Sequence, residues 1–195
     1  LINETNPDSA LAADAINTWY GRGGIPVGIR PDTKDNGSLY PKTLAAEFPR
    51  VLQRSDLVDA VWLYRKLLSE SPDKSVTILS IGGLENLIAQ NESPADEHSP
   101  LAGHELVTKK VRLLSQMGGQ HPAGWEWNFD QDRWATERLI NGTTNSPDGW
   151  TAPAIFSGRE IGEQIFTGKS LKYTSNDNPV RRAYEIYLDG NFSAG

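Results

Sequence analysis

The sequence predicts an α/β protein with an open, mainly parallel, Rossmann-like sheet and helices on both faces. Three short apolar runs, at residues 76–81, 112–117 and 153–156, have the composition of buried strands. A helix is expected after each run, from residue 84, at 130–140 and at 158–166, and strands alternating with helices form parallel βαβ units. At 195 residues the chain can bury a sizeable core, so we expect one domain over residues 1–195.

The N-terminal part is expected to contribute a helix, an edge strand and a loop. Asn6 followed by proline is a helix-start signal, and segment 9–20 has apolar residues at helical spacing. Residues 25–29 have strand composition, and the proline within them favours an end or edge position. Residues 30–42, rich in Pro, Asp, Asn and Gly, are expected to form a loop long enough to cover a pocket.

Further helices are expected along the rest of the chain. Ser55 can cap a helix that carries Leu57, Val61, Tyr64 and Leu68 on one face. Residues 92–104 are polar and are expected to form a loop. One further helix is expected to begin at residue 84. Four others are expected at residues 105–110, 130–140, 158–166 and 178–188.

Composition and charge argue against several kinds of partner and site. The net charge of −6 and the pI near 5.1 argue against nucleic acid, whose backbone requires clustered Lys and Arg. No apolar run approaches the length of a membrane-spanning helix, so no membrane partner is expected. Because the chain has no cysteine and three histidines, any bound metal is expected to be a hard cation with oxygen ligands.

The first residue bears on where the protein is found. The chain begins at Leu1, and its sole methionine is Met117. We therefore expect that a signal peptide or a larger N-terminal piece precedes these residues in the gene. A signal peptide would imply a soluble protein that is secreted or periplasmic, whereas the alternative leaves the location open.

The most informative segment is MGGQHPAGWEWNF, residues 117–129, directly after the strand expected at 112–117. Ligands of open α/β sheets bind beyond the carboxyl ends of the strands. A sugar needs polar partners for its hydroxyls and an aromatic plane for its C–H face, and this segment offers both kinds of group. The alternative is a surface loop whose tryptophans cap the core. The groups concerned belong to Gln120, His121, Trp125, Glu126, Trp127 and Asn128.

Glycine pairs end two of the expected strands, at residues 82–83 and 118–119. Neither pair fits the phosphate-binding glycine patterns. They are therefore either tight strand-to-helix turns or turns whose exposed carbonyls bind a cation or a sugar.

The segments VTILSIGGLENL (76–87), LLSQMGG (113–119), WEWNF (125–129) and PAIFSG (153–158), taken in order, resemble the inosine-uridine-preferring nucleoside hydrolase family. NPDS (6–9) and NPVRRAY (178–184) are similar to a bacterial nucleoside-hydrolase-like branch. The resemblance implies an open α/β fold. It also implies hydrolysis of the N-glycosidic bond of ribonucleosides or related glycosides, by a calcium-bound water and through an oxocarbenium-like transition state.

The resemblance also implies roles for individual residues. Glu126 and Asn128, with Gln120 upstream, would hydrogen-bond the ribose hydroxyls, and Asn6 would also contact the sugar. The backbone carbonyl of Ile81, just before the first glycine pair, would be a calcium ligand. The substrate would be a small-molecule nucleoside or sugar.

Residue chemistry leaves several interpretations open. Glu126 could be a solvated loop acid, although its place between two indoles favours a buried acid with a partner. Trp125 and Trp127 could stack on a base or sugar, or could pack in the core. His121 could protonate a departing purine as a catalytic acid, although an exposed loop histidine is the commoner case. The Arg181-Arg182 pair is expected on a solvated helix face.

Two departures from the family pattern lead to two hypotheses. The family's Asp-rich N-terminal motif and its last catalytic Asp have no counterpart here, so the domain is expected to be incomplete at both ends. The chain is then either part of a hydrolase or a carbohydrate- or nucleoside-binding module without a complete calcium site. Loss of a central strand would leave sheet edges unpaired, so we expect another segment of the same protein or a homo-oligomer to cover them.

Overall fold

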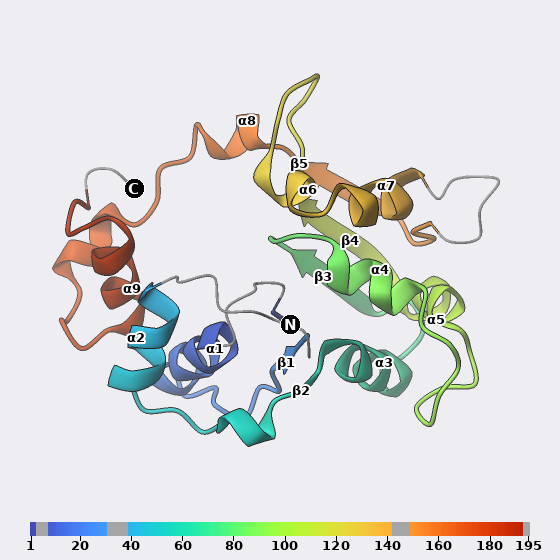
Figure 1. Cartoon of the computed structure of the whole chain (residues 1–195), viewed down its shortest axis with the longest axis horizontal. Coiled ribbons are helices and arrows are strands. Elements are labelled where there is room, and N and C mark those ends of the chain that lie inside the picture. The colour runs from blue at the N-terminus through green and yellow to red at the C-terminus, as the bar shows by residue number, and fades with distance from the viewer. Residues whose placement is uncertain (3–7, 31–38, 142–148, 193–195) are drawn as a thin grey trace. The chain divides into compact units, whose positions relative to one another are not determined.

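The computed structural model describes residues 1–2, 8–30, 39–141 and 149–192 (Figure 1). The chain divides into two compact units, unit 1 with residues 1–59 and 165–195, and unit 2 with residues 60–164. In the described residues, helices flank two small parallel sheets of two and three strands, which confirms the predicted open α/β class. The single domain over residues 1–195 stays a prediction.

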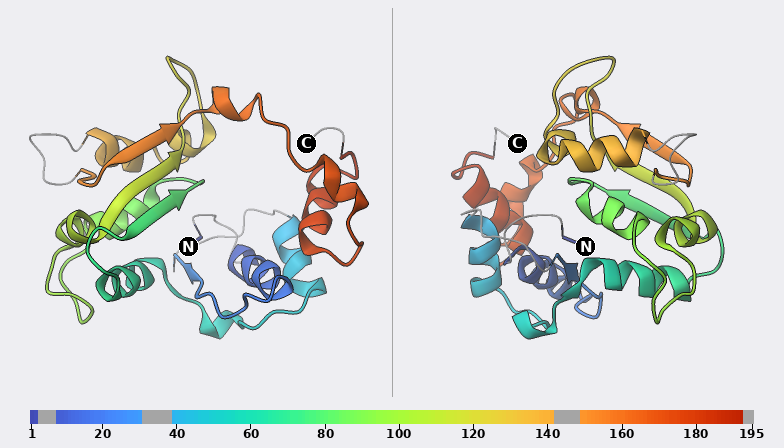
Figure 2. Two further views of the ribbon diagram at one scale, coloured as in Figure 1. Left: turned by 180° about the vertical axis from the view of Figure 1, so that it is seen from behind. Right: turned by 45° about the vertical axis from the view of Figure 1, so that its right-hand side comes forward.

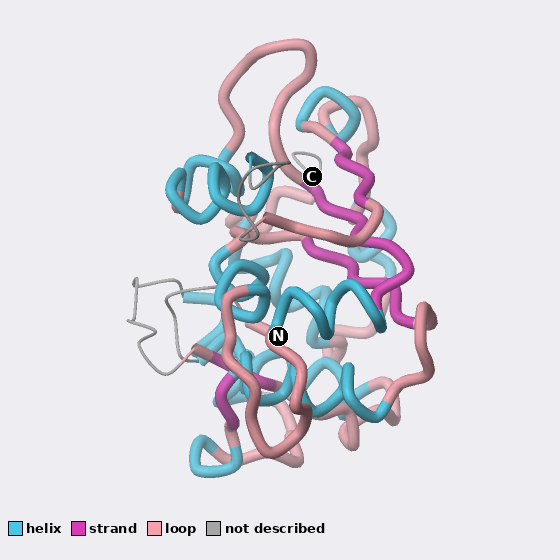
Figure 3. Tube along the Cα trace, turned by 90° about the vertical axis from the view of Figure 1, so that its right-hand side faces the viewer, coloured by secondary structure: helices cyan, strands magenta, loops and turns pink. Residues whose placement is uncertain are grey.

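Unit 2 is built on a three-stranded parallel sheet. Its strands are β3 (Val76–Ser80), β4 (Val111–Met117) and β5 (Ala154–Ser157), with β4 in the centre. Ser80 pairs with Gln116, and Met117 pairs with Ser157, so the carboxyl ends of the three strands meet at one edge. Figure 3 shows these strands side by side. The segments that follow the three strands are therefore brought together at this edge of the sheet.

One face of this sheet packs against helices. The apolar core of unit 2 joins the strands to α3 (Ala60–Glu70), α4 (Glu85–Asn91), α5 (Gly103–Lys110) and α7 (Arg133–Asn141). Seen from behind, the strands lie in front of α4 and α7 (Figure 2, left). Side chains alternate between the faces of a strand. Leu79 and Ile155 consequently project from the other face and are exposed, and the covering of this sheet by another segment or a second copy stays a prediction.

Unit 1 consists mainly of helices. Helix α1 (Asp8–Trp19) packs against α2 (Leu39–Glu47), and both contact α9 (Pro179–Tyr187). Two short strands, β1 (Gly28–Ile29) and β2 (Val58–Asp59), pair in parallel. The 3₁₀ helices η1 (Arg54–Asp56) and η2 (Lys169–Tyr173) complete the unit. No helix in the described parts of either unit is long and apolar enough to cross a membrane.

The structure corrects two predicted elements in unit 1. The helix expected from Ser55 begins only at Ala60, because Val58 and Asp59 pair with β1 and thereby hold Leu57 outside the helix. Part of the loop predicted at 30–42 is helical, since α2 begins at Leu39. A proline in its first turn is compatible with a helix there, because the first amides have no partner within a helix.

Two predicted helices of unit 2 are also interrupted. Residues 130–140 are divided between α6 (Trp127–Gln131) and α7, and Asp132 lies between them with an extended backbone. Its Oδ1 accepts the amide of Ala135 at 3.0 Å and so starts the second helix. The helix expected at 158–166 is the short α8 (Arg159–Gly162).

Candidate functional site

The loop of residues 118–126 joins β4 to α6 at the carboxyl edge of the unit 2 sheet (yellow in Figure 1). Its first part forms hydrogen bonds with the end of β5 and the start of α8. The amide of Gly118 donates to the carbonyl of Ser157 at 3.0 Å, and the amide of Arg159 donates to the carbonyl of Gly119 at 2.9 Å. Gly119 has a φ of +78°, which favours glycine at this turn. The predicted location of the segment, just beyond β4, is confirmed.

Glu126 is buried and links the two ends of this loop through its carboxylate. It is the N-cap residue of α6, and only 6% of it is exposed. Its carboxylate accepts three backbone amides, from Gly119 at 3.0 Å, Asn128 at 2.9 Å and Phe129 at 3.2 Å. The interpretation as a solvated loop acid is therefore wrong, because these amides bury the carboxylate. Its contact with a sugar stays a prediction.

Asn128 and Gln116 connect the ends of β4 and β3. The Nδ2 group of Asn128 donates to the carbonyl of Met117 at 3.1 Å. The Nε2 group of Gln116 donates to the same carbonyl at 2.6 Å and to the carbonyl of Gly82 at 3.1 Å. Hydrogen bonds thus run from the first glycine pair to Asn128, so both glycine pairs lie at one edge.

Gln116 was not among the predicted site residues. It is almost completely buried, and its Oε1 atom has no hydrogen-bond partner among the described residues. The signal was present in the sequence, because this amide side chain stands two residues after Leu114 and therefore on the same, buried face of the strand.

Trp125 and Trp127 lie at the surface. They are 48% and 62% exposed, and their ring centroids are 6.2 Å apart at an interplanar angle of 73°. The indole of Trp125 hydrogen-bonds Asp130, and this bond, ahead of the nearby Arg133, lowers the pKa of that carboxyl. The core-packing interpretation of the two tryptophans is therefore wrong, because large parts of both rings meet solvent.

Gln120 and His121 occupy the outer part of the loop. The Gln120 side chain lies directly over Gly124, where an added Cβ would be 2.1 Å from its Oε1 atom. No hydrogen bond of the Gln120 amide to a described residue is formed. The backbone amide of His121 donates to Glu160 at 3.0 Å, which lowers the pKa of that carboxyl and leaves the imidazole exposed. Glu160 was not predicted, because it comes from α8.

The remaining residues that the family resemblance implies are the calcium ligand Ile81 and the sugar contact Asn6. Ile81 follows β3 and its side chain is 84% exposed. Its carbonyl would be one ligand where calcium needs about six to eight oxygens. No group of three or more His, Cys, Asp or Glu residues that could hold a metal occurs in the described parts of the chain, so these residues alone do not fit a calcium ion. Asn6 lies outside the described residues.

Comparisons with known proteins do not assign a family. No family model matches the sequence, and no curated protein matches it significantly. The resemblance to nucleoside hydrolases therefore rests on the quoted segments and stays a hypothesis.

Proposed function

We propose that the loop of residues 118–126 and the helix α6 that follows it bind a sugar or a nucleoside at the carboxyl edge of the unit 2 sheet. The observation that carries this proposal is the pair of exposed indoles, Trp125 and Trp127, on the same segment as the Gln120 amide, which has no hydrogen-bond partner among the described residues. Flat aromatic faces and planar hydrogen-bonding side chains are the two kinds of group that a sugar needs.

Each residue of the loop has a distinct part in this proposal. Trp127 has the larger exposed surface, so it is the better stacking face for a sugar ring or a base. The Gln120 amide can donate to one hydroxyl and accept from a second. Asn128 uses its Nδ2 group within the protein, which leaves Oδ1 to accept a hydroxyl hydrogen.

The fastening of the loop supports binding as well. Glu126 accepts three amides, and the Gly118-Gly119 turn forms two further hydrogen bonds, one with Ser157 of β5 and one with Arg159 of α8. A loop that is already ordered loses little conformational entropy when a ligand binds, so more of the contact energy contributes to affinity. Glu126 thereby supports the site as a positioning residue.

Calorimetric titration of the protein with inosine, with uridine and with ribose tests this proposal. We expect saturable binding that the change Trp127→Ala weakens about tenfold, the equivalent of one good stacking contact. Trp134→Ala is the matched control, since Trp134 is also exposed but lies on α7. Equal affinities of the two variants, or no binding of any of the three compounds, would exclude the site.

A second candidate function is hydrolysis of the bound N-glycoside, which the family resemblance supports. As the N-glycosidic bond breaks, the exposed imidazole of His121 on the same loop could give a proton to the departing base nitrogen, while water adds to the anomeric carbon and releases its proton to solvent. Chromatographic measurement of base release, with and without added calcium, separates the candidates. Release that His121→Ala slows would support hydrolysis, whereas binding without release would support a binding module.

A further inference from the structure

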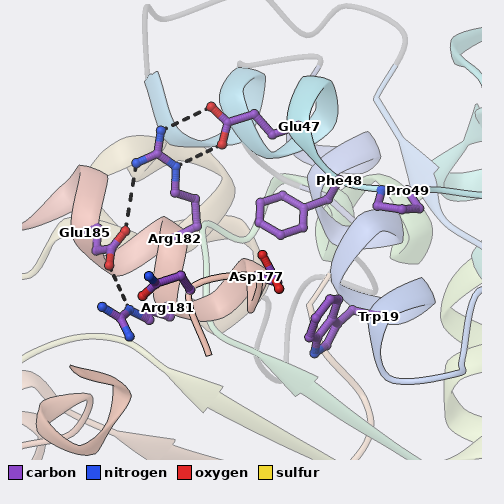
Figure 4. A pocket seen from close by; sticks show the side chains of 9 residues that line it. Trp19, Glu47, Phe48, Pro49, Asp177, Arg181, Arg182 and Glu185 are labelled. Atoms are coloured by element: carbon purple, nitrogen blue, oxygen red, sulfur yellow. Dashed lines mark hydrogen bonds and ion pairs between the residues drawn. The ribbon is translucent and has the colours of Figure 1, made fainter. Parts of the chain in front are cut away.

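Unit 1 contains a pocket of about 640 Å³ that the predicted site does not use (Figure 4). Its size lies within the range of small-molecule sites, roughly 300–1,000 Å³. The end of α1 provides an aromatic wall, the end of α2 provides a second aromatic ring and a carboxylate, and α9 with the residues before it provides charged groups. The residues used below are Trp19, Glu47, Phe48, Asp177, Arg181 and Arg182.

The two guanidinium groups of the pocket are already neutralised. Arg182 donates to both carboxylate oxygens of Glu47, at 2.9 and 3.1 Å. This pairing lowers the pKa of Glu47 and raises that of Arg182, so both groups stay charged. Arg181 pairs with Glu185 at 2.8 Å and also donates to the carbonyl of Thr174. Neither arginine is left to attract an anion.

Asp177 is the carboxylate without a counter-charge. No hydrogen bond or ion pair of its side chain to a described residue is formed, while Glu47 and Glu185 are both paired. The pocket therefore has three carboxylates facing two guanidinium groups, and the excess negative charge is on Asp177.

Aromatic rings lie beside this carboxylate. Trp19 is 42% exposed, and its ring meets that of Phe48 edge to face with centroids 6.5 Å apart. Figure 4 shows the Asp177 side chain between these two rings. Aromatic faces attract cations through their quadrupole, and a nearby carboxylate adds a direct charge interaction. A carboxylate between aromatic rings is thus suited to an organic cation.

We propose that this pocket binds a small organic cation, with an ammonium or guanidinium group at Asp177 and an apolar body against Trp19 and Phe48. A bare metal ion fits less well, because the indole and phenyl rings offer it no oxygen ligands. This site is separate from the proposed sugar site, since all of its lining residues belong to unit 1.

Calorimetric titrations with choline and with agmatine test the proposal, and 3,3-dimethylbutan-1-ol serves as the neutral analogue of choline. We expect choline or agmatine to bind with a dissociation constant below about 10 mM, and the neutral alcohol to bind at least tenfold more weakly. Which of the two cations binds more tightly identifies the preferred head group.

Variants locate the binding. Asp177→Asn preserves the shape of an exposed side chain and removes its charge, so it should weaken cation binding at least tenfold, and Trp19→Leu should weaken it several-fold. Glu137→Gln and Trp134→Leu are matched controls on α7 of unit 2 and should leave the affinity unchanged. Circular dichroism checks that the variants fold. Equal binding of choline and the neutral alcohol, an unaltered affinity in Asp177→Asn, or no binding of either cation would overturn the proposal.

Discussion

Two acidic residues beside aromatic rings, Glu126 in unit 2 and Asp177 in unit 1, are used in opposite ways. Glu126 is the N-cap of α6, and its carboxylate accepts three backbone amides. At α9 the capping residue is Asn178, whose Oδ1 accepts the amides of Val180 and Arg181. Asp177 lies one residue earlier, and its carboxylate stays at the surface without a partner among the described residues.

This difference shows that the position of a polar side chain at the start of a helix decides whether it stabilises the helix or stays available to a ligand. A capping side chain is held by amides that no other group in the helix can satisfy, so it gains stability and becomes less available to a ligand. The residue before the cap has no such amide within reach. We therefore assign Glu126 to supporting a loop and Asp177 to binding, although both are acids next to tryptophan or phenylalanine. The variants below test this assignment.

The largest expected effect is that of Glu126→Ala. Removal of the carboxylate leaves three amides without their acceptor in a mostly buried place, so we expect the free energy of unfolding to fall by about 2–4 kcal/mol. Urea unfolding followed by circular dichroism measures this change. Glu137→Ala, at an exposed position on α7, should change it by less than about 0.5 kcal/mol. A loss from Glu126→Ala no larger than that of the control would contradict the loop-closing role.

Gly118→Ala tests how closely the same loop is packed. An added Cβ would lie 2.1 Å from Cε1 of Phe129, whose ring also meets Phe156 with centroids 6.0 Å apart. Because this ring packs against the core, we expect a loss of about 1–3 kcal/mol in urea unfolding. At Gly162 an added Cβ meets nothing within 4 Å, so Gly162→Ala should be neutral or stabilising. Two equal results would show that Phe129 moves aside freely.

Asp96 is intermediate between the buried Glu126 and the exposed Asp177, because it is partly exposed but pairs with a buried arginine. Its carboxylate lies 2.8 Å from Nε of Arg65, and this bond is the main reason that the pKa of Asp96 is lowered. Because the pKa of Asp96 is lower in the folded state, the pair stabilises the protein fully at pH values above the pKa of an aspartate in the unfolded chain, about 3.9. This stabilisation is lost as the pH falls through the lower pKa of the folded state. We expect Asp96→Asn to cost about 1–2 kcal/mol at pH 7.

The cost of Asp96→Asn should shrink as the pH is lowered below about 4, because the wild-type carboxyl then becomes neutral too. Unfolding curves recorded at several pH values check this. Glu137→Gln is a control for a general charge effect, since Glu137 is an exposed acid on α7. A cost of Asp96→Asn that does not vary with pH would show that the ion pair is not its source.

The smallest expected effect on stability is that of Asp177→Asn. Because its carboxylate has no partner in the described residues, the free energy of unfolding should change by less than about 0.5 kcal/mol. The contrast with Glu126→Ala in the same urea assay is the direct test of the comparison. A loss above about 1 kcal/mol would show that Asp177 has a structural role.

Features that depend on neighbouring residues were determined by the sequence alone. The three strands of unit 2 occur close to the predicted ranges, because short runs rich in β-branched and apolar residues that end at glycine suit a half-buried strand. The last helix begins at Pro179 as expected, since Asn178 caps it through bonds to residues two and three positions away. The position of the 118–126 loop at the carboxyl edge follows from strand order along the chain.

Only the tertiary structure decided what the polar and aromatic side chains of these loops do. The burial of Glu126, the exposure of Trp125 and Trp127 and the role of Gln116 depend on how the loop folds back onto the ends of β3 and β5. The unit 1 pocket depends on pairing across even longer separations, since Glu47 and Arg182 are 135 positions apart. Sequence periodicity reports neighbours within a few residues, whereas burial and charge pairing are set by packing between distant segments.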